Sequence, residues 1–312
     1  MRDFIDEKVR LTCERLWKLS QKTIYEIPKM KYIPCGYKSG NPIPMPDETW
    51  HEFERGDFLI GADKHFWFYT EFKTPSAEKD KEVVFELKTS NEGEWDATNP
   101  QIILYLNGEI VSGMDINHRR IFLKPETEYK ALMYLYTGRM EGRIDFIADL
   151  KLIDLKIQKL YYDMQVPYEA AMCYGKKEYP FIRSMKHLEQ ACNMINFSRE
   201  TDSEEFIHGI EAADEYMVRE YYEKVCGNSE AVVSLIGHTH IDVAWLWTLD
   251  QTREKVQRTF STALSLMDRY PEYVFMSLQP QLYEYLKEDA PELYEKVKQR
   301  VKEGRWEVEG AM

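Results

Sequence analysis

The sequence predicts a multidomain α+β protein. It would comprise an amino-terminal helix, a β-sandwich, a helical connector and the first strands of a parallel β/α barrel. Three observations lead to this fold class. Short apolar runs separated by turn residues occupy the middle of the chain, which is typical of a sandwich. An acidic stretch with helical spacing follows. Beyond residue 230, strand-like and helix-like segments alternate, as they do in parallel α/β sheets.

The first segment, residues 1–30, is predicted to be an amphipathic helix. Apolar residues between 4 and about 28, among them Val9 and Leu16, recur at helical spacing, and Pro28 ends the pattern.

Residues 31–167 are predicted to form the β-sandwich. Asn107-Gly108 between two apolar runs indicates a hairpin, and further turn residues occur at 91–93 and 137–138. The candidate strands are 50–53, 65–72, 83–87, 102–106, 129–136 and 144–157. Aromatic residues are dense here, namely Trp50, Phe66, Trp67, Phe68 and Tyr69. Such rings usually fill a core, although they also form stacking platforms in carbohydrate-binding modules.

Residues 168–229 are predicted to be a helical connector with solvated acidic faces. Its apolar stripe comprises Phe206, Ile207, Ile210, Ala213, Met217 and Tyr221. His187 and His208 lie on these helices without a second ligand four residues away, so a packing or surface role is the better interpretation.

Residues 230–312 are predicted to begin a β/α domain. The apolar run 231–236 indicates a buried strand, a helix at 249–270 ends before Pro271, and a second strand covers 274–278. A helix from 281 to about 303, broken near Pro291, ends at Gly304, and a third strand starts at Trp306. This order predicts a parallel sheet with right-handed crossovers. Three strands cannot close a barrel, so the chain is expected to stop inside this domain at Met312.

Composition narrows the functional classes. A net charge of −13 disfavours nucleic-acid and anionic-membrane surfaces, and there is no apolar run of membrane-spanning length. Five scattered cysteines and a charged start without a signal-peptide core favour a reducing cytoplasm. No phosphate-binding glycine motif is present.

The segment 237–247 holds the candidate chemistry. If the strand conformation continues, His238, His240 and Asp242 project from one face, because strand side chains alternate. Two imidazoles and a carboxylate at a strand end suit zinc. Trp245 offers an apolar surface on which a sugar ring can stack. The simpler alternative is a histidine-rich polar strand end without a metal.

This segment resembles glycoside hydrolase family 38, the retaining α-mannosidases. The resemblance extends from the run at 237–247 through 253–255, 258–260 and 277–279 to 306–310, and so covers roughly Val232 to Met312. The preceding residues resemble the accessory region of the family's cytosolic and bacterial branch. Leu249 lies near a position where other members carry proline.

The resemblance implies a zinc site and a mannose-containing oligosaccharide substrate. It assigns His240 and Asp242 as zinc ligands and Trp245 to the sugar subsite. It implies a further Asp, also the nucleophile, and a further His downstream, so the nucleophile and acid/base are expected beyond Met312. For His238, a hydrogen bond to a ligand is favoured over direct zinc contact. Glu307 and Glu309 are better interpreted as strand residues than as catalytic ones.

The 312-residue chain alone is expected to be inactive, because only two of the four implied zinc ligands lie in it. Its open three-stranded sheet is expected to expose apolar edges and to favour association, including homo-oligomers. Three other functions were weighed. Metallo-β-lactamases place a histidine directly after the Asp, where this chain has Val243. Amidohydrolases also open their barrel with His-x-His but usually lack the Trp-x-Trp. A glycan-binding module would bind sugar whether or not a chelator is present, whereas a chelator would remove the activity of the enzyme.

Overall fold

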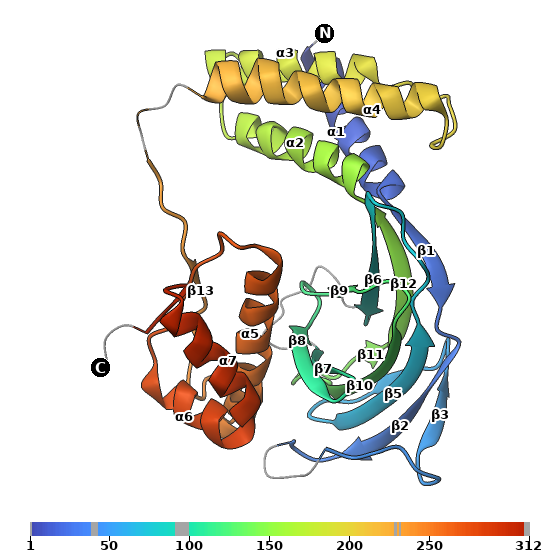
Figure 1. The fold of residues 1–312 in the computed structure, drawn as a ribbon, viewed down its shortest axis with the longest axis vertical. Coiled ribbons are helices and arrows are strands. Elements are labelled where there is room, and N and C mark those ends of the chain that lie inside the picture. The colour runs from blue at the N-terminus through green and yellow to red at the C-terminus, as the bar shows by residue number, and fades with distance from the viewer. Residues whose placement is uncertain (1, 39–42, 91–99, 228–229, 231, 309–312) are drawn as a thin grey trace. The chain divides into compact units, whose positions relative to one another are not determined.

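The computed structural model describes residues 2–38, 43–90, 100–227, 230 and 232–308 (Figure 1). The protein is mixed α/β, with helices, antiparallel sheets and one parallel sheet. Contacts divide it into two compact units: Met1–Ile24, Ser76–Val84 and Lys151–Val233 in the first, and Tyr25–Pro75, Phe85–Leu150 and Ser234–Met312 in the second. The domain boundaries inferred from the sequence, at residues 30, 167 and 229, stay predictions.

The first unit is mainly a helical bundle. It contains α1 (Arg2–Leu19), α2 (Leu155–Met172), α3 (Tyr179–Met194), α4 (Glu204–Tyr216) and the π-helix η2 (Met217–Cys226). Its core is built from apolar positions at helical spacing, including Val9, Leu16, Leu160, Leu188 and Phe206. Across the described residues, no helix has the length and apolar character needed to cross a bilayer.

The predicted amino-terminal helix is too long at its carboxyl end. The helix α1 stops at Leu19, and residues Gln21–Glu26 form strand β1. The Ser20 hydroxyl donates a hydrogen bond to the Trp17 carbonyl at 2.8 Å, which satisfies one carbonyl of the last turn. Thr23, Ile24 and Tyr25 favour strand conformation, and β1 pairs with β12 (Ile147–Asp154).

The predicted last strand of the sandwich, 144–157, is likewise too long. The structure instead has a short strand at Arg143–Ile144, strand β12, and helix α2 from Leu155. Asp154 caps this helix, because its side chain accepts from the backbone N–H groups of Lys156 and Ile157.

Two sheets pack face to face. The six-stranded sheet has the order β3 (His51–Glu54), β2 (Lys29–Cys35), β5 (His65–Lys73), β10 (Glu128–Tyr136), β7 (Gln101–Leu106), β8 (Glu109–Met114). The four-stranded sheet has the order β1, β12, β6 (Lys81–Lys88), β9 (Arg120–Leu123), and a small sheet pairs β11 (Arg143–Ile144) with β4 (Leu59–Ile60). Phe72 of β5 stacks on Phe85 of β6 at 5.3 Å between ring centroids, as expected between sandwich layers.

The hairpin at Asn107-Gly108 is confirmed. Strands β7 and β8 are antiparallel neighbours on either side of these two residues. Asn107 has φ 51° and Gly108 has φ 90°, and positive φ at both positions is the conformation of a type I′ turn.

The β/α segment follows the predicted order, with shorter strands. It runs β13 (Gly237–His238), α5 (Leu249–Arg269), β14 (Phe275–Met276), α6 (Pro280–Asp289), α7 (Pro291–Lys302) and β15 (Trp306–Glu307). The strands pair in parallel in the order β13-β14-β15.

The predicted buried strand at 231–236 is wrong for the residues that the structure describes. Val232 and Leu235 are 94% and 88% exposed, and residues 232–236 have no regular structure. The only strand paired with β13 in the described part is β14, and its register begins at Gly237. No sheet neighbour therefore covers these apolar side chains.

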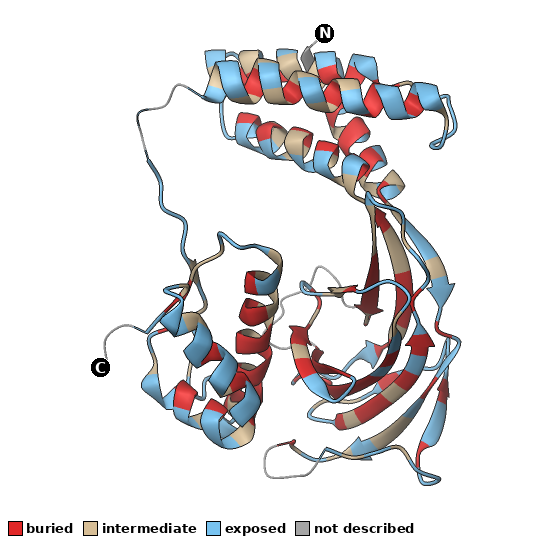
Figure 2. Cartoon of the chain, viewed as in Figure 1, coloured by how far each residue is buried: buried red, intermediate tan, exposed pale blue. Residues whose placement is uncertain are grey.

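Within the second unit, helix α5 packs on the six-stranded sheet, and its buried face is visible in Figure 2. Val256 and Phe260 of α5 share one apolar cluster with Trp67, Ile103 and Tyr134 of the sheet. Trp50, Trp67 and Phe68 are buried, so core packing is the role of these rings.

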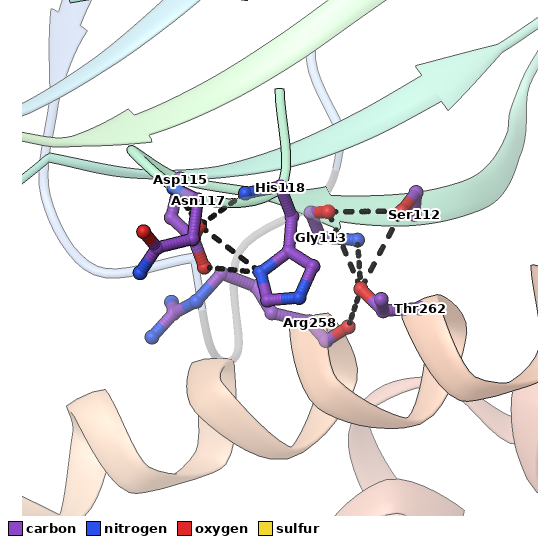
Figure 3. A network of polar contacts seen from close by, with 7 residues as sticks. All are labelled: Ser112, Gly113, Asp115, Asn117, His118, Arg258 and Thr262. Carbon is purple, nitrogen blue, oxygen red and sulfur yellow. Dashed lines mark hydrogen bonds and ion pairs between the residues drawn. The ribbon is translucent and has the colours of Figure 1, made fainter. Parts of the chain in front are cut away.

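A glycine allows α5 to approach β8 closely. The Gly113 N–H donates to the Thr262 hydroxyl at 3.2 Å, and that hydroxyl lies 2.8 Å from the Arg258 carbonyl oxygen (Figure 3). A Cβ atom at Gly113 would lie 2.6 Å from the Cβ of Arg258. Only glycine fits this contact without a backbone shift.

Candidate metal and sugar site

His240 and Asp242 point toward each other. The His240 Nε2 and Asp242 Oδ1 atoms are 3.1 Å apart, and both side chains are reachable by solvent. Ile241 between them is fully buried, so the backbone here is held against the core while its neighbours face outward.

The loop that follows Asp242 is anchored to the first turn of α5. Thr252 is fully buried, and its hydroxyl accepts hydrogen bonds from the Ala244 N–H at 3.2 Å and the Trp247 indole at 3.1 Å. The same hydroxyl donates to the carbonyl of Thr248, the N-cap residue of α5. Ala244 has φ 61°, which non-glycine residues rarely adopt, and the contact with Thr252 holds it there.

Trp245 and Trp247 have different environments. Trp247 is buried, and the Lys255 ammonium lies 4.4 Å from its ring centroid. Trp245 is 56% exposed and meets Trp247 edge-on, with 5.6 Å between centroids. Trp245 is therefore the tryptophan of this loop that offers a ring surface to a ligand.

The predicted convergence of three side chains on one strand face is only partly realised. Strand β13 ends at His238, so the alternation does not continue through His240 and Asp242. His238 is exposed, and no hydrogen bond joins it to His240 or Asp242. Within the described part of the chain, no three His, Cys, Asp or Glu side chains are grouped to hold a metal ion. The role of His238 stays a prediction.

Sequence reasoning missed a buried polar cluster beside this loop. The Glu254 Oε1 atom accepts from the Tyr134 hydroxyl at 2.5 Å and from the Lys38 backbone N–H at 2.9 Å. His65 Nδ1 lies 2.6 Å from the Tyr134 hydroxyl, and the Lys38 ammonium donates to Gln257.

Burial shifts the ionisation of this cluster. It raises the pKa of Glu254 and lowers the pKa of His65 to about 4. No local signal marks this cluster. Glu254 and Arg258 are four residues apart and share one face of α5, roughly opposite the face of Val256 and Phe260, so helical spacing alone does not show that the charged face is also buried.

The end of the chain that carries this site is similar to a known family. Residues 230–312 match the model of the glycosyl hydrolases family 38 N-terminal domain. The matched residues include His240, Asp242 and Trp245, in agreement with the resemblance found in the sequence.

Curated relatives are α-mannosidases. Alpha-mannosidase G of Dictyostelium discoideum is 33% identical over 159 residues, which cover 51% of this chain and 14% of that protein. The alpha-mannosidase of Saccharomyces cerevisiae is 33% identical, covering 48% of this chain and 14% of that protein. Human alpha-mannosidase 2C1 is 27% identical over 75% of this chain and 23% of its own length. The chain thus spans less than a quarter of these relatives.

Among solved structures, a beta-glucuronidase from Ruminococcus gnavus aligns with 43% of this chain and 28% of its own, at 11% identity and a TM-score of 0.26. A score of this size does not establish a shared fold.

Proposed function

We propose that this chain is part of a zinc-dependent retaining α-mannosidase that removes terminal mannose from oligosaccharides. The observation that carries the proposal is the His240–Asp242 pair, 3.1 Å apart, inside the segment that matches family 38. The names of the curated relatives support the substrate class. A β/α barrel for the catalytic domain, a cytoplasmic location and homo-oligomeric assembly are further parts of the proposal.

The two side chains fit a zinc ion by chemistry and by spacing. Imidazole nitrogen and carboxylate oxygen are ordinary zinc ligands. In a tetrahedral site with bond lengths of about 2.0–2.1 Å, two ligand atoms lie about 3.3 Å apart. The observed separation of 3.1 Å is close to this, so one ion can accept both atoms after small side-chain rotations. A bound zinc ion would supply charge that orients and polarises sugar hydroxyl groups.

The remaining residues of the loop would position the sugar. Asp242 serves as a ligand in this proposal and is not the nucleophile. The exposed Trp245 ring would pack against the apolar face of a pyranose. The buried Trp247 would fix the loop, because its indole donates to the Asp242 backbone carbonyl at 3.2 Å.

The alternatives have less support. An amidohydrolase site would require both histidines of the His-x-His pair to converge, whereas His240 pairs with Asp242 and no hydrogen bond in the described structure joins it to His238. The family match also favours a glycosyl hydrolase over a metallo-β-lactamase. A non-catalytic glycan-binding module would explain sugar binding but gives no role to the His240–Asp242 pair.

The test is hydrolysis of an aryl α-mannoside by the intact protein, with and without a chelator. The proposal expects activity that a chelator removes and zinc restores. Activity that survives complete zinc removal would exclude the zinc-dependent mechanism. Absence of α-mannosidase activity in zinc-loaded protein would exclude the substrate assignment.

A further inference from the structure

A cavity lies beside Trp247, within the second compact unit. It has a volume of about 650 Å³ and is lined by the segment 34–37, residues 63–66, Tyr136, Arg139, Trp247, Thr248 and Gln251. We call it the Trp247 pocket. None of the residues assigned to the zinc site or to the Trp245 surface lines it.

Aromatic rings form one wall of the Trp247 pocket. The ring of His65 lies 4.4 Å from that of Tyr37 and 4.9 Å from that of Tyr136, measured between centroids. Trp247, whose ring is mostly covered, contributes to the rim of the pocket. Flat apolar surfaces of this kind pack well against the C–H face of a pyranose.

The ring of His65 in this pocket has a nitrogen atom that is available to accept a hydrogen bond. The Tyr134 hydroxyl has one proton, which it donates to Glu254 Oε1. His65 Nδ1, 2.6 Å from that hydroxyl, must therefore carry the proton of their hydrogen bond. In neutral His65 this leaves Nε2 as an acceptor, and no hydrogen bond in the described structure uses it.

Gln251 provides the complementary donor. Gln251 lines the pocket and is only 5% exposed, and its buried Nε2 atom has no hydrogen-bond partner in the described structure, so a ligand would reach this donor after a rotation of the side-chain amide. A buried amide without a partner is costly, so a ligand that pairs with it is favoured. A sugar hydroxyl group can both donate and accept a hydrogen bond, so a pocket with one acceptor and one donor beside aromatic rings suits a sugar.

Asp63 and Arg139 are two of the three acidic or basic residues that line the pocket, and both have partners, whereas the Lys64 ammonium has none in the described structure. Asp63 accepts a hydrogen bond from the Tyr136 hydroxyl, and the Arg139 guanidinium donates to the Leu246 carbonyl. We propose that the Trp247 pocket is a binding subsite for a neutral pyranose unit and that it binds this sugar without a metal. Because Trp247 also donates to the Asp242 carbonyl, an occupied pocket would contact the loop of the zinc site.

The experiment is a titration of the full chain with methyl α-D-mannopyranoside in the presence of EDTA, followed by NMR. A Kd on the order of 1 mM is expected, typical of a small ligand with few contacts. Gly36 offers a pocket-filling variant, because a Cβ there would meet no atom within 4 Å. Gly142 has the same open surroundings and does not line the pocket, so Gly142→Leu is the matched control.

Gly36→Leu is expected to raise Kd at least about tenfold, the loss of roughly one good contact. Gly142→Leu and Asp242→Ala should leave it unchanged. Gln251→Met, which keeps the side-chain length and removes the amide, should also weaken binding without changing the circular dichroism spectrum.

The proposal is overturned if the wild-type chain shows no saturable binding, or if Gly36→Leu binds as well as Gly142→Leu. It is equally overturned if binding needs zinc or Asp242, because the sugar would then occupy the zinc site. Displacement of the sugar by inorganic phosphate at similar concentration would contradict a neutral-ligand site. The EDTA condition keeps this result independent of the proposed mannosidase activity.

Discussion

The Trp247 indole N–H donates a hydrogen bond to the backbone carbonyl of Asp242 at 3.2 Å. This contact connects the predicted metal ligand to a tryptophan that is itself held by Thr252 at the start of α5. The position of the Asp242 carboxylate thus depends on a buried helix terminus as well as on strand β13.

Thr252→Val should destabilise the protein. The hydroxyl of Thr252 takes part in three hydrogen bonds, and its loss leaves the Ala244 N–H without this partner and the Trp247 indole with the Asp242 carbonyl alone. We expect a loss of about 1–3 kcal/mol in the free energy of unfolding, measured in urea. Thr259→Val in the same helix is the control, and an equal effect of both substitutions would contradict the anchoring role.

Trp245→Ala should weaken substrate use in the intact protein and leave its zinc content unchanged. The ring is exposed, so its removal opens no core cavity. An increase in KM of about tenfold is expected if one stacking contact is lost. If the substitution instead lowers thermal stability and leaves the kinetics alone, Trp245 has a packing role.

The arrangement of elements was largely predictable because it depends on local patterns. Asn107-Gly108 determines its hairpin through backbone conformations that few other residues adopt. The helix α5 has a Thr248 cap, apolar positions at helical spacing and a proline after its end. The exposure of residues 232–236 was not predictable, because an apolar run does not reveal whether a neighbouring strand covers it.

Gly113→Ala should separate α5 from β8. The new methyl group would lie 2.6–2.8 Å from atoms of Arg258, including its backbone. Overpacking of this kind costs about 1–3 kcal/mol, which denaturant unfolding can measure. Gly142→Ala meets no atom within 4 Å and should be nearly neutral. Equal stability of the two variants would mean that the helix and strand are farther apart than described.

His65 should make stability depend on pH on the acid side. Burial lowers its pKa from 6.5 to about 4, so the folded state binds the proton less tightly than the unfolded state. The contribution of neutral His65 to the free energy of unfolding is complete above pH 6.5 and is lost as the pH falls toward 4. The loss would be at most about 3 kcal/mol.

The matched variant is His65→Asn, whose amide can still donate to Tyr134 but does not titrate. Free energies of unfolding, measured between pH 7 and pH 4, should fall more steeply for the wild type than for the variant. Parallel curves would show that the burial of His65 does not control this pH dependence.

The candidate site was only partly predictable. Residue type and spacing selected His238, His240 and Asp242, and the resemblance to family 38 assigned His240 and Asp242 as ligands, which stays a prediction; neither step depends on distant contacts. The Trp247 pocket combines residues from β2, β5, β10 and the start of α5, separated by more than a hundred positions in sequence. Nothing local in Gln251 or His65 indicates that they meet. The Glu254 cluster also depends on how α5 packs on the sheet.

Zinc binding to the 312-residue chain tests the central claim most directly. Affinity can be measured by competition with a chromophoric chelator for the wild type, His240→Ala, Asp242→Ala and His238→Ala. Because we propose only two zinc ligands in this chain, the wild type should bind one zinc ion weakly. His240→Ala and Asp242→Ala should each abolish this binding, and His238→Ala should reduce it only in part. Unchanged zinc affinity after either of the first two substitutions would show that His240 and Asp242 are not the metal ligands.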